Sequence, residues 1–105
     1  MGTLFYGGNA QPIDIDDRTL AHLKVVIATK LRRGESFTLS WTHAENDEPG
    51  RSTLWVHASI PLRFSFDSPE PEQLSPEWVK ELAESANSSG GILLVPEHIR
   101  SSQKR

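Results

Sequence analysis

Residues 14–41, which read DIDDRTLAHLKVVIATKLRRGESFTLSW, constrain the fold more than any other part of the chain. Asp16 or Asp17 can cap a helix by accepting hydrogen bonds from first-turn amides, and Gly34 can take the left-handed conformation that ends it. Between them, apolar residues recur at the spacing of one helical face, with Val26 at its edge: Leu20, Leu23, Ile27 and Leu31. Burial is worth roughly 1.5–3 kcal/mol per such side chain, so we expect this face to lie in the core.

Alternating apolar residues and turn signals divide the remaining sequence into strands and a second helix. Strands are expected at residues 3–6, 12–15, 37–43, 52–58, 60–66 and 92–95, the first two as a hairpin. The second helix begins with Ser75 as its cap and Pro76 as its first residue, and it is stopped by residues 87–91. Residues 37–66 predict an antiparallel meander with one buried face. The order ββαβββαβ predicts a two-layer α+β domain, with an antiparallel-rich sheet and two helices on one of its faces.

Length and composition limit the class of protein. The 105 residues suffice for one hydrophobic core, which we assign to residues 1–97, and the polar, basic residues 98–105 are expected to be a disordered tail. Cysteine is absent, which excludes thiol catalysis, cysteine-ligated zinc and disulfides. The start MGTLFYGG lacks the pattern of a signal peptide, and no apolar run reaches about 18 residues. We therefore expect a cytoplasmic protein without a membrane partner.

The formal net charge of −3 conceals an uneven distribution of charge. Five of the eleven basic residues and none of the fourteen acidic ones lie between positions 18 and 33, and residues 98–105 add three further basic residues. The rest of the chain is strongly acidic. This division argues against a general nucleic-acid coat, while it leaves room for a local basic site.

Several segments resemble a family of small actinobacterial proteins of unknown function: MGTLFYGG, IDIDDRTLAHLKVVI, KLRRGESF, RSTLWVHASIPLRF and GGILLVPE. The resemblance covers nearly all of residues 1–97, and some members of that family carry the label ATP-dependent DNA ligase. Such ligases need a Lys-x-Asp-Gly motif whose lysine takes up AMP, and no lysine of this chain is followed by that pattern. A chain of 105 residues is also too short for a nucleotidyltransferase domain and a DNA-clamping domain together. The resemblance therefore implies a fold and no mechanism.

The face of the first helix opposite the leucines holds much of the positive charge. A helical wheel places Lys24 and Lys30 beside the apolar stripe and the following residues opposite it: Arg18, His22, Thr29, Arg32 and Arg33. One interpretation is a phosphate-contacting, weak nucleic-acid-binding surface formed by four cations: Arg18, Lys24, Arg32 and Arg33. The other is a solvated helix face whose C-terminal cations interact favourably with the helix dipole, and we favour this one.

Trp41 and Trp55 lie on strands that we expect to be neighbours. They could form a common stacking platform for bases or a flat ligand. Alternatively, Trp41 belongs to the core and Trp55 packs on the outer face, which we favour. That outer face would be mildly polar because of five hydroxyl side chains: Thr38, Ser40, Thr42, Thr53 and Ser65. Such a face suits a partner surface, with Trp55, His57 and Arg63 as its candidate contacts.

The four histidines, at positions 22, 43, 57 and 98, lack the spacing of metal ligands, and no nucleophile or phosphate-binding motif is present. We therefore expect no metal and no cofactor, and we lean against an enzyme. The leading hypothesis is a small binding or adaptor domain that contacts another protein or a second copy of itself. The alternatives are weak nucleic-acid binding through the first helix, and a ligase-related or accessory role that rests on the family label alone.

Overall fold

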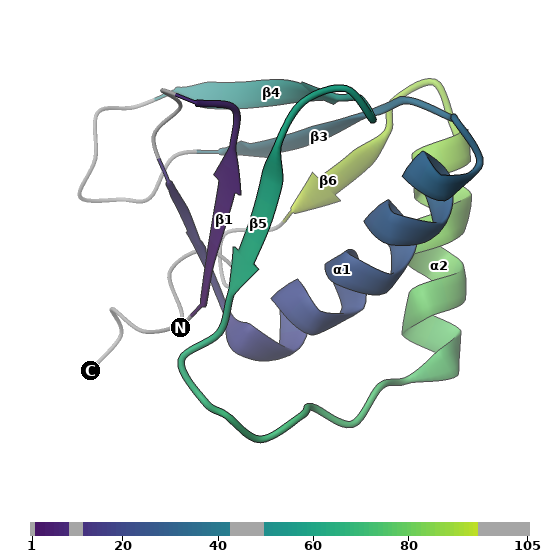
Figure 1. The fold of residues 1–105 in the computed structure, drawn as a ribbon. Helices are drawn as coiled ribbons and strands as arrows, with labels where there is room; N and C mark the ends of the chain where they lie inside the picture. Colours follow the sequence, from purple (N-terminus) through teal and green to yellow (C-terminus); the bar gives the residue numbers. More distant parts are fainter. Residues whose placement is uncertain (1, 9–11, 43–49, 95–105) are drawn as a thin grey trace.

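The computed structural model describes residues 2–8, 12–42 and 50–94, which form six strands and two helices (Figure 1). In chain order the elements are β1 (Gly2–Tyr6), β2 (Ile13–Ile15), α1 (Asp17–Arg32), β3 (Phe37–Thr42), β4 (Arg51–Val56), β5 (Leu62–Ser65), α2 (Pro76–Asn87) and β6 (Ile92–Leu94). The predicted α+β class and the order ββαβββαβ are confirmed. His43 and the tail expected at residues 98–105 lie outside the described residues.

The strands form two three-stranded sheets, where the sequence predicted one. The first sheet has the order β2-β1-β5 and is antiparallel throughout, and its β1–β2 pair is the predicted N-terminal hairpin. The second sheet has the order β4-β3-β6, with β3 antiparallel to β4 and parallel to β6. Strand β3 is therefore the centre of the second sheet, between β4 and β6.

The predicted meander is wrong at β5, which pairs with β1 and not with β4. The chain turns after β4, where the Ile60 N–H donates to the His57 carbonyl at 3.1 Å. The Pro61 carbonyl then accepts a hydrogen bond from the Gly7 N–H at 3.0 Å, and β5 continues beside β1. Alternation in a sequence identifies the buried face of a strand but not its neighbour, which is why the pattern misassigned β5.

The ends of α1 follow the prediction closely. Asp16 is the N-cap, and its carboxylate accepts a hydrogen bond from the Thr19 N–H at 3.2 Å. Gly34 has a φ of 75°, the left-handed conformation that ends the helix without a steric penalty only for glycine. The leucine face is in the core, where Leu20 and Leu23 are fully buried.

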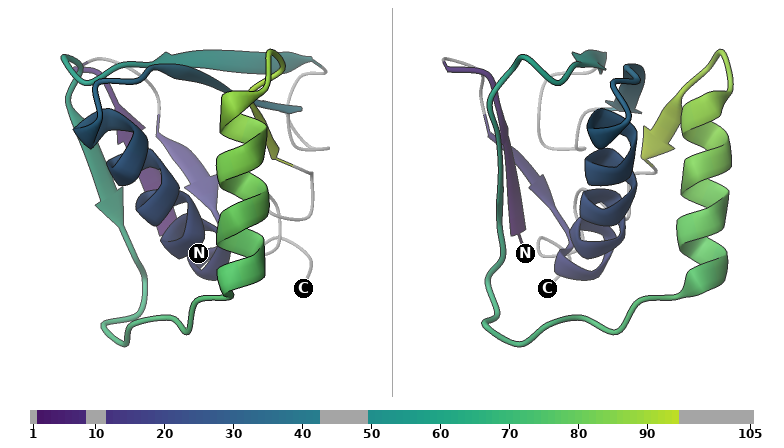
Figure 2. Two further views of the ribbon diagram at one scale, coloured as in Figure 1. Left: turned by 90° about the vertical axis from the view of Figure 1, so that its right-hand side faces the viewer. Right: turned by 45° about the vertical axis from the view of Figure 1, so that its right-hand side comes forward.

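Helix α1 lies between the first sheet and α2, with β1 and β5 on one side and α2 on the other (Figure 2). Because α2 covers a second side of α1, His22 is completely buried and Lys30 nearly so. The prediction that the face opposite the leucines is solvated is therefore wrong at His22. It holds at Arg18, Thr29, Arg32 and Arg33, which are exposed.

Helix α2 packs against α1, and β6, which follows it, pairs with β3 in the second sheet. Ser75 caps α2 as predicted, because its Oγ accepts a hydrogen bond from the Trp78 N–H at 3.2 Å, and Pro76 opens the helix. Gly91 has a φ of 70°, and a Cβ there would overlap Thr38, so glycine allows β6 to approach β3 closely. Among the described residues, neither helix is long and apolar enough to cross a membrane.

Candidate functional site

The second sheet has one covered face and one open face. Its register brings the side chains of β3 and β4 onto common faces, as Phe37 with Val56 on the covered face and Thr38 with Trp55 on the other. Leu93 of β6 lies beside Ser40 on the same side as Trp55. We call the uncovered side the open face and define it by seven residues: Thr38, Ser40, Thr42, Arg51, Thr53, Trp55 and Leu93.

Two large apolar side chains protrude from the open face. Trp55 is 58% exposed and Leu93 is 65% exposed, whereas Ile92 and Leu94, on the covered side of the same short strand, are buried. Between the two protruding side chains lies β3, whose open-face residues are Thr and Ser. The Ser40 Oγ is 2.8 Å from the Thr53 Oγ1, so the hydroxyls at the centre of the face bond to each other.

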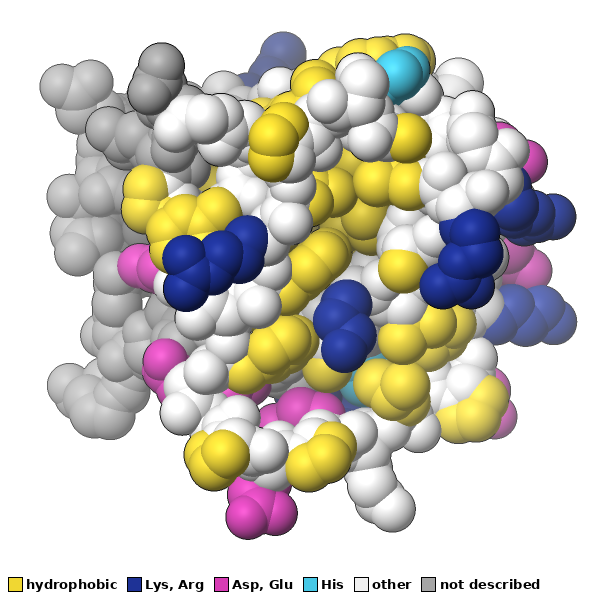
Figure 3. Space-filling model, viewed as in Figure 1, with side chains coloured by type: hydrophobic (Ala, Val, Ile, Leu, Met, Phe, Trp, Pro, Cys, Tyr) yellow, Lys and Arg dark blue, Asp and Glu magenta, His cyan; other side chains and the backbone are white. Residues whose placement is uncertain are grey.

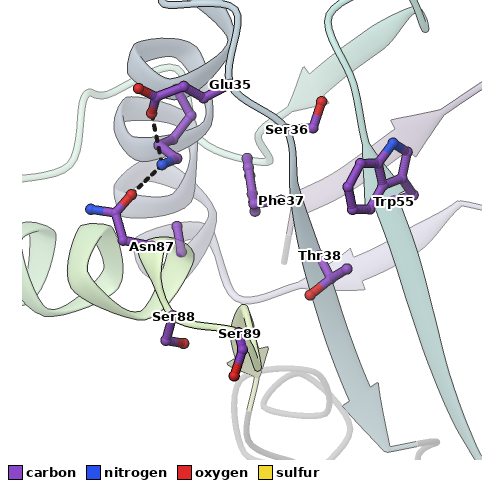
Figure 4. Close-up of a pocket in the computed structure, with 10 residues that line it drawn as sticks. Glu35, Ser36, Phe37, Thr38, Trp55, Asn87, Ser88 and Ser89 are labelled. Carbon is purple, nitrogen blue, oxygen red and sulfur yellow. Dashed lines mark hydrogen bonds and ion pairs between the residues drawn. The ribbon is translucent and has the colours of Figure 1, made fainter.

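A pocket of about 350 Å³ adjoins the open face at the start of β3. Figure 4 shows Trp55 and Thr38 on one side of this pocket, and the end of α2 on the other. The lining is rich in hydroxyl and amide groups: Ser36, Thr38, Asn87, Ser88 and Ser89. The pocket extends the polar surface around Trp55 toward the helix ends.

An ion pair lies at the helix side of the pocket (Figure 4). The Lys30 ammonium is 2.8 Å from the Glu35 Oε1, and it also donates to the Asn87 Oδ1. The hydrogen bond from Lys30 to Glu35 and the charge of Lys30, with a lesser effect of Arg33, lower the pKa of the Glu35 carboxyl despite desolvation. Lys30 thus joins the C-terminal ends of α1 and α2, where a cation is favoured by the helix dipoles.

The structure separates the two tryptophans of the second sheet. Trp41 is opposite Ser52 and shares the covered face with Phe37 and Leu39, whereas Trp55 is on the open face. Trp41 packs against the core. A common stacking platform is therefore excluded, and the predicted division into one core and one outer tryptophan is confirmed.

The three expected partner contacts do not lie on one sheet. His57 follows β4 directly and is exposed, with its Nδ1 accepting a hydrogen bond from the Ser59 N–H at 3.0 Å. Arg63 belongs to β5 in the first sheet, and its guanidinium carbon is 5.0 Å from the centre of the Phe5 ring. Ser65, expected on the open face, is also in the first sheet. The misassignment of β5 in the sequence explains both displacements.

Three residues near the start of α1 hold the connector between β5 and α2, residues 66–75. The Asp17 carboxylate accepts hydrogen bonds from the backbone N–H groups of residues 67 and 68, at 3.3 and 3.2 Å. The Arg18 guanidinium donates to the Gln73 carbonyl at 2.7 Å. His22 Nε2 accepts a hydrogen bond from the Ser75 N–H at 2.8 Å.

His22 is the residue whose role the sequence did not indicate. Because a backbone N–H can only donate, the Nε2 atom that meets Ser75 is unprotonated, and Nδ1 donates to the Arg18 carbonyl at 2.7 Å. Its ring centre is 4.2 Å from that of Trp78. His22 therefore fixes the start of α2 on α1, a structural role that only the packing of the two helices reveals.

The four cations proposed for nucleic-acid binding are exposed but dispersed: Arg18, Lys24, Arg32 and Arg33. Arg18 is engaged with the connector, and the Lys24 Nζ lies 5.8 Å from the centre of the Phe66 ring. About 21 Å of helix axis separates Arg18 from Arg32, at 1.5 Å per residue. On the face drawn in Figure 3, Lys and Arg side chains are distributed singly or in small groups and do not form one continuous patch.

A second hollow, of about 380 Å³, lies between α1 and the connector. Its lining is mostly apolar, including Val25, Phe66 and Leu74, with Lys24 facing a segment that carries Glu70 and Glu72. Within the described residues, no group of three or more His, Asp or Glu side chains is placed to hold a metal ion.

Fold and site together define a small α+β domain with an open, almost uncharged sheet face. The chain belongs to the family described as Domain of unknown function (DUF7882), whose model matches residues 1–97. No curated protein and no solved structure matches the chain. The predicted membership of a family of unknown function is thereby confirmed.

Proposed function

We propose that this protein is a binding domain that contacts another protein chain through its open face. The observation that carries the proposal is the exposure of Trp55 and Leu93 on one sheet face that has Arg51 as its single charged residue. Charged residues make up 24% of the whole sequence, and the open face, with one charged residue among seven, is somewhat poorer in charge and has no acidic residue.

The composition of the open face matches that of a protein interface. Interface centres are depleted of charged residues and enriched in aromatic ones, and tryptophan is prominent among the residues that dominate binding energy. Exposed Trp55 and Leu93 cost solvation free energy in the isolated chain, and a partner that covers them recovers it. The hydroxyl groups between them keep the face compatible with water when it is free.

The size of the open face sets the expected strength of binding. Strands β3 and β4 have six residues each and β6 has three, and at about 3.3 Å per residue and about 4.8 Å between strands they cover about 240 Å². A stable interface buries about 800 Å² on each partner. Even with the adjoining pocket, the open face therefore supports a weak or transient contact, with a dissociation constant in the micromolar range or above.

The test compares two variants with the unmodified chain in affinity capture after mild cross-linking. Trp55→Thr combined with Leu93→Thr removes both apolar side chains from the open face. Leu74→Thr is the matched control, because Leu74 is 45% exposed but lies in the connector. The proposal predicts a protein, or the chain itself, that is retained by the unmodified chain and by the control and is lost with the double variant. Equal retention by all three would contradict it.

A second candidate is weak nucleic-acid binding through α1, favoured by the exposure of all four cations: Arg18, Lys24, Arg32 and Arg33. Four phosphate contacts give a slope of about −3.6 for log affinity against log salt concentration on duplex DNA. Replacing the four residues by Glu should abolish retention on DNA. Affinity that does not change with salt, or retention that survives the replacement, removes this candidate.

The ligase label that some members of the resembling family carry gives a third candidate, with the least support. The sequence contains no Lys-x-Asp-Gly motif. Incubation with labelled ATP is therefore expected to leave no covalent adenylate, and nick sealing should be absent.

We also propose that the protein is cytoplasmic. The lack of cysteine supports this location, because disulfides form in oxidising compartments outside the cytoplasm.

A further inference from the structure

We propose that the partner on the open face is a second copy of this chain, held face to face by two equivalent contacts between Trp55 of one copy and Leu93 of the other. This inference rests on the proposed function, since it names the partner for the same surface. It follows from where the two apolar side chains lie on the sheet.

Trp55 and Leu93 lie on opposite sides of the central strand. Trp55 is on β4 and Leu93 is on β6, with β3 between them. A twofold axis that runs along β3, midway between two facing sheets, exchanges the two sides. It brings each Trp55 over the β6 side of the other copy, where Leu93 protrudes. Such an interface is isologous, the commonest kind in homodimers.

The levels of the two side chains along β3 are compatible with this contact. Trp55 is level with Thr38, and Leu93 is level with Ser40. The offset is two residues, or about 7 Å along the strand. The length of an indole side chain can bridge it.

Small residues on the opposite flank provide the space that the two large side chains need. The axis sets β3 over β3 of the other copy, so that Trp55 lies over Gly91, which is level with Thr38. Leu93 likewise lies over Thr53, which is level with Ser40. Facing sheets pack about 10 Å apart, which requires large side chains of one sheet to fit over small ones of the other. Each large side chain of the open face meets a small residue in this arrangement, so the face is complementary to itself.

The charge of the three strands permits a second copy as the partner and offers little to a partner selected by charge. Two copies with a net charge of −3 repel each other, but none of the residues of β3, β4 and β6 is acidic. The three strands themselves therefore bring no negative charge into the contact. A partner selected by charge would need a charged surface to recognise, and the open face offers Arg51 alone, at the end of β4 away from Trp55.

The absence of cysteine from the chain allows a direct test by single-cysteine cross-linking. Ser40→Cys places a thiol on the central strand, where the twofold axis brings it opposite its counterpart. Both thiols project into the space between the sheets, so a short bismaleimide with a spacer below the sheet separation of about 10 Å joins the two copies. Leu74→Cys, on the exposed connector, is the control for random collisions.

The expected result is a covalent dimer with Ser40→Cys and at least about tenfold less with Leu74→Cys, at equal concentration. Adding Trp55→Thr to Ser40→Cys should reduce the dimer by a similar factor, while circular dichroism shows that the fold is kept. Equal cross-linking of Ser40→Cys and Leu74→Cys, or dimer that persists after Trp55→Thr, would overturn the inference.

Sedimentation of the unmodified chain separates this inference from the proposed function. A weight-average mass that rises with concentration and falls back with Trp55→Thr supports the pair of copies. A strict monomer that still captures a different protein through Trp55 refutes the second copy and leaves the proposed function standing. A strict monomer refutes both if the proteins it captures are captured equally well by the double variant.

Discussion

Helix α1 and the open face differ in charge and in whether their most prominent side chains are engaged within the molecule or exposed to solvent. The helix and the residue after it carry five of the eleven basic residues, whereas the open face carries one. Yet Arg18 and His22 hold the connector, and Lys30 joins the two helix ends inside the molecule. On the open face, Trp55 and Leu93 remain exposed. A concentration of charge in a sequence therefore does not by itself show which cations the fold leaves available, and the uncovered apolar side chains are the basis of our proposal.

The largest expected effect is on the helix side of this comparison, at His22. His22→Ala removes a fully buried ring from Trp78 and leaves the Ser75 N–H without its acceptor. The free energy of unfolding should fall by about 2–4 kcal/mol, measured by urea denaturation. His57→Ala is the control, since His57 is exposed, and should change it by less than about 0.5 kcal/mol. Similar losses for both would show that α1 is not fixed to the connector as described.

A smaller effect is expected at the Lys30–Glu35 pair, and it depends on pH. Lys30 lowers the pKa of the Glu35 carboxyl in the folded chain. A carboxyl whose pKa is lowered on folding contributes stability above the unfolded value, 4.5, and loses it as pH falls through the folded value. Glu35→Gln should therefore lower stability at neutral pH and reduce the loss of stability between neutral and acidic pH.

Glu84→Gln, an exposed position on α2, serves as the control for Glu35→Gln in the same acid titration. The comparison uses urea denaturation at neutral pH and below pH 4.5. If the two variants had identical pH profiles, Lys30 and Glu35 would not be coupled, and the pair would not contribute to joining the helix ends.

The smallest effect on stability is expected on the open face. Trp55→Thr with Leu93→Thr removes exposed side chains and retains residues suited to strands, so the free energy of unfolding should change by about 0.5 kcal/mol or less. The same variant should lose association. Leu39→Ala, the control on the covered face of the same sheet, should instead cost at least about 2 kcal/mol. A large loss of stability from the open-face variant would mean that Trp55 acts in folding and not in contact with a partner.

The caps, the helix faces and the order of elements could be predicted from the sequence because their causes are local. Asp16 and Ser75 each accept a hydrogen bond from an amide three residues later, and Gly34 adopts the left-handed conformation directly after the helix that it ends. The alternation of β3 and β4 likewise assigned Trp41 to the core and Trp55 to the outside. Each of these features depends on residues that are close together in the chain.

The pairing of β5 and the burial of His22 could not be predicted, because both depend on contacts across the chain. Strand β5 follows β4 in sequence but pairs with β1, some 60 residues earlier, and alternation is the same for either neighbour. His22 meets Ser75, 53 residues away, on a side of α1 that looks polar in a helical wheel. The candidate site was consequently predicted only in part: Trp55 was identified, while Arg63 was assigned to the wrong sheet and Leu93 was missed.

The most direct test of the account is a concentration series of amide NMR spectra, with both regions observed in one experiment. The account predicts that the signals of Thr38, Ser40, Thr53 and Leu93 shift as the concentration rises, while those along the exposed side of α1 stay fixed. Shifts confined to α1 around Arg32 and Arg33, with an unchanged open face, would contradict it.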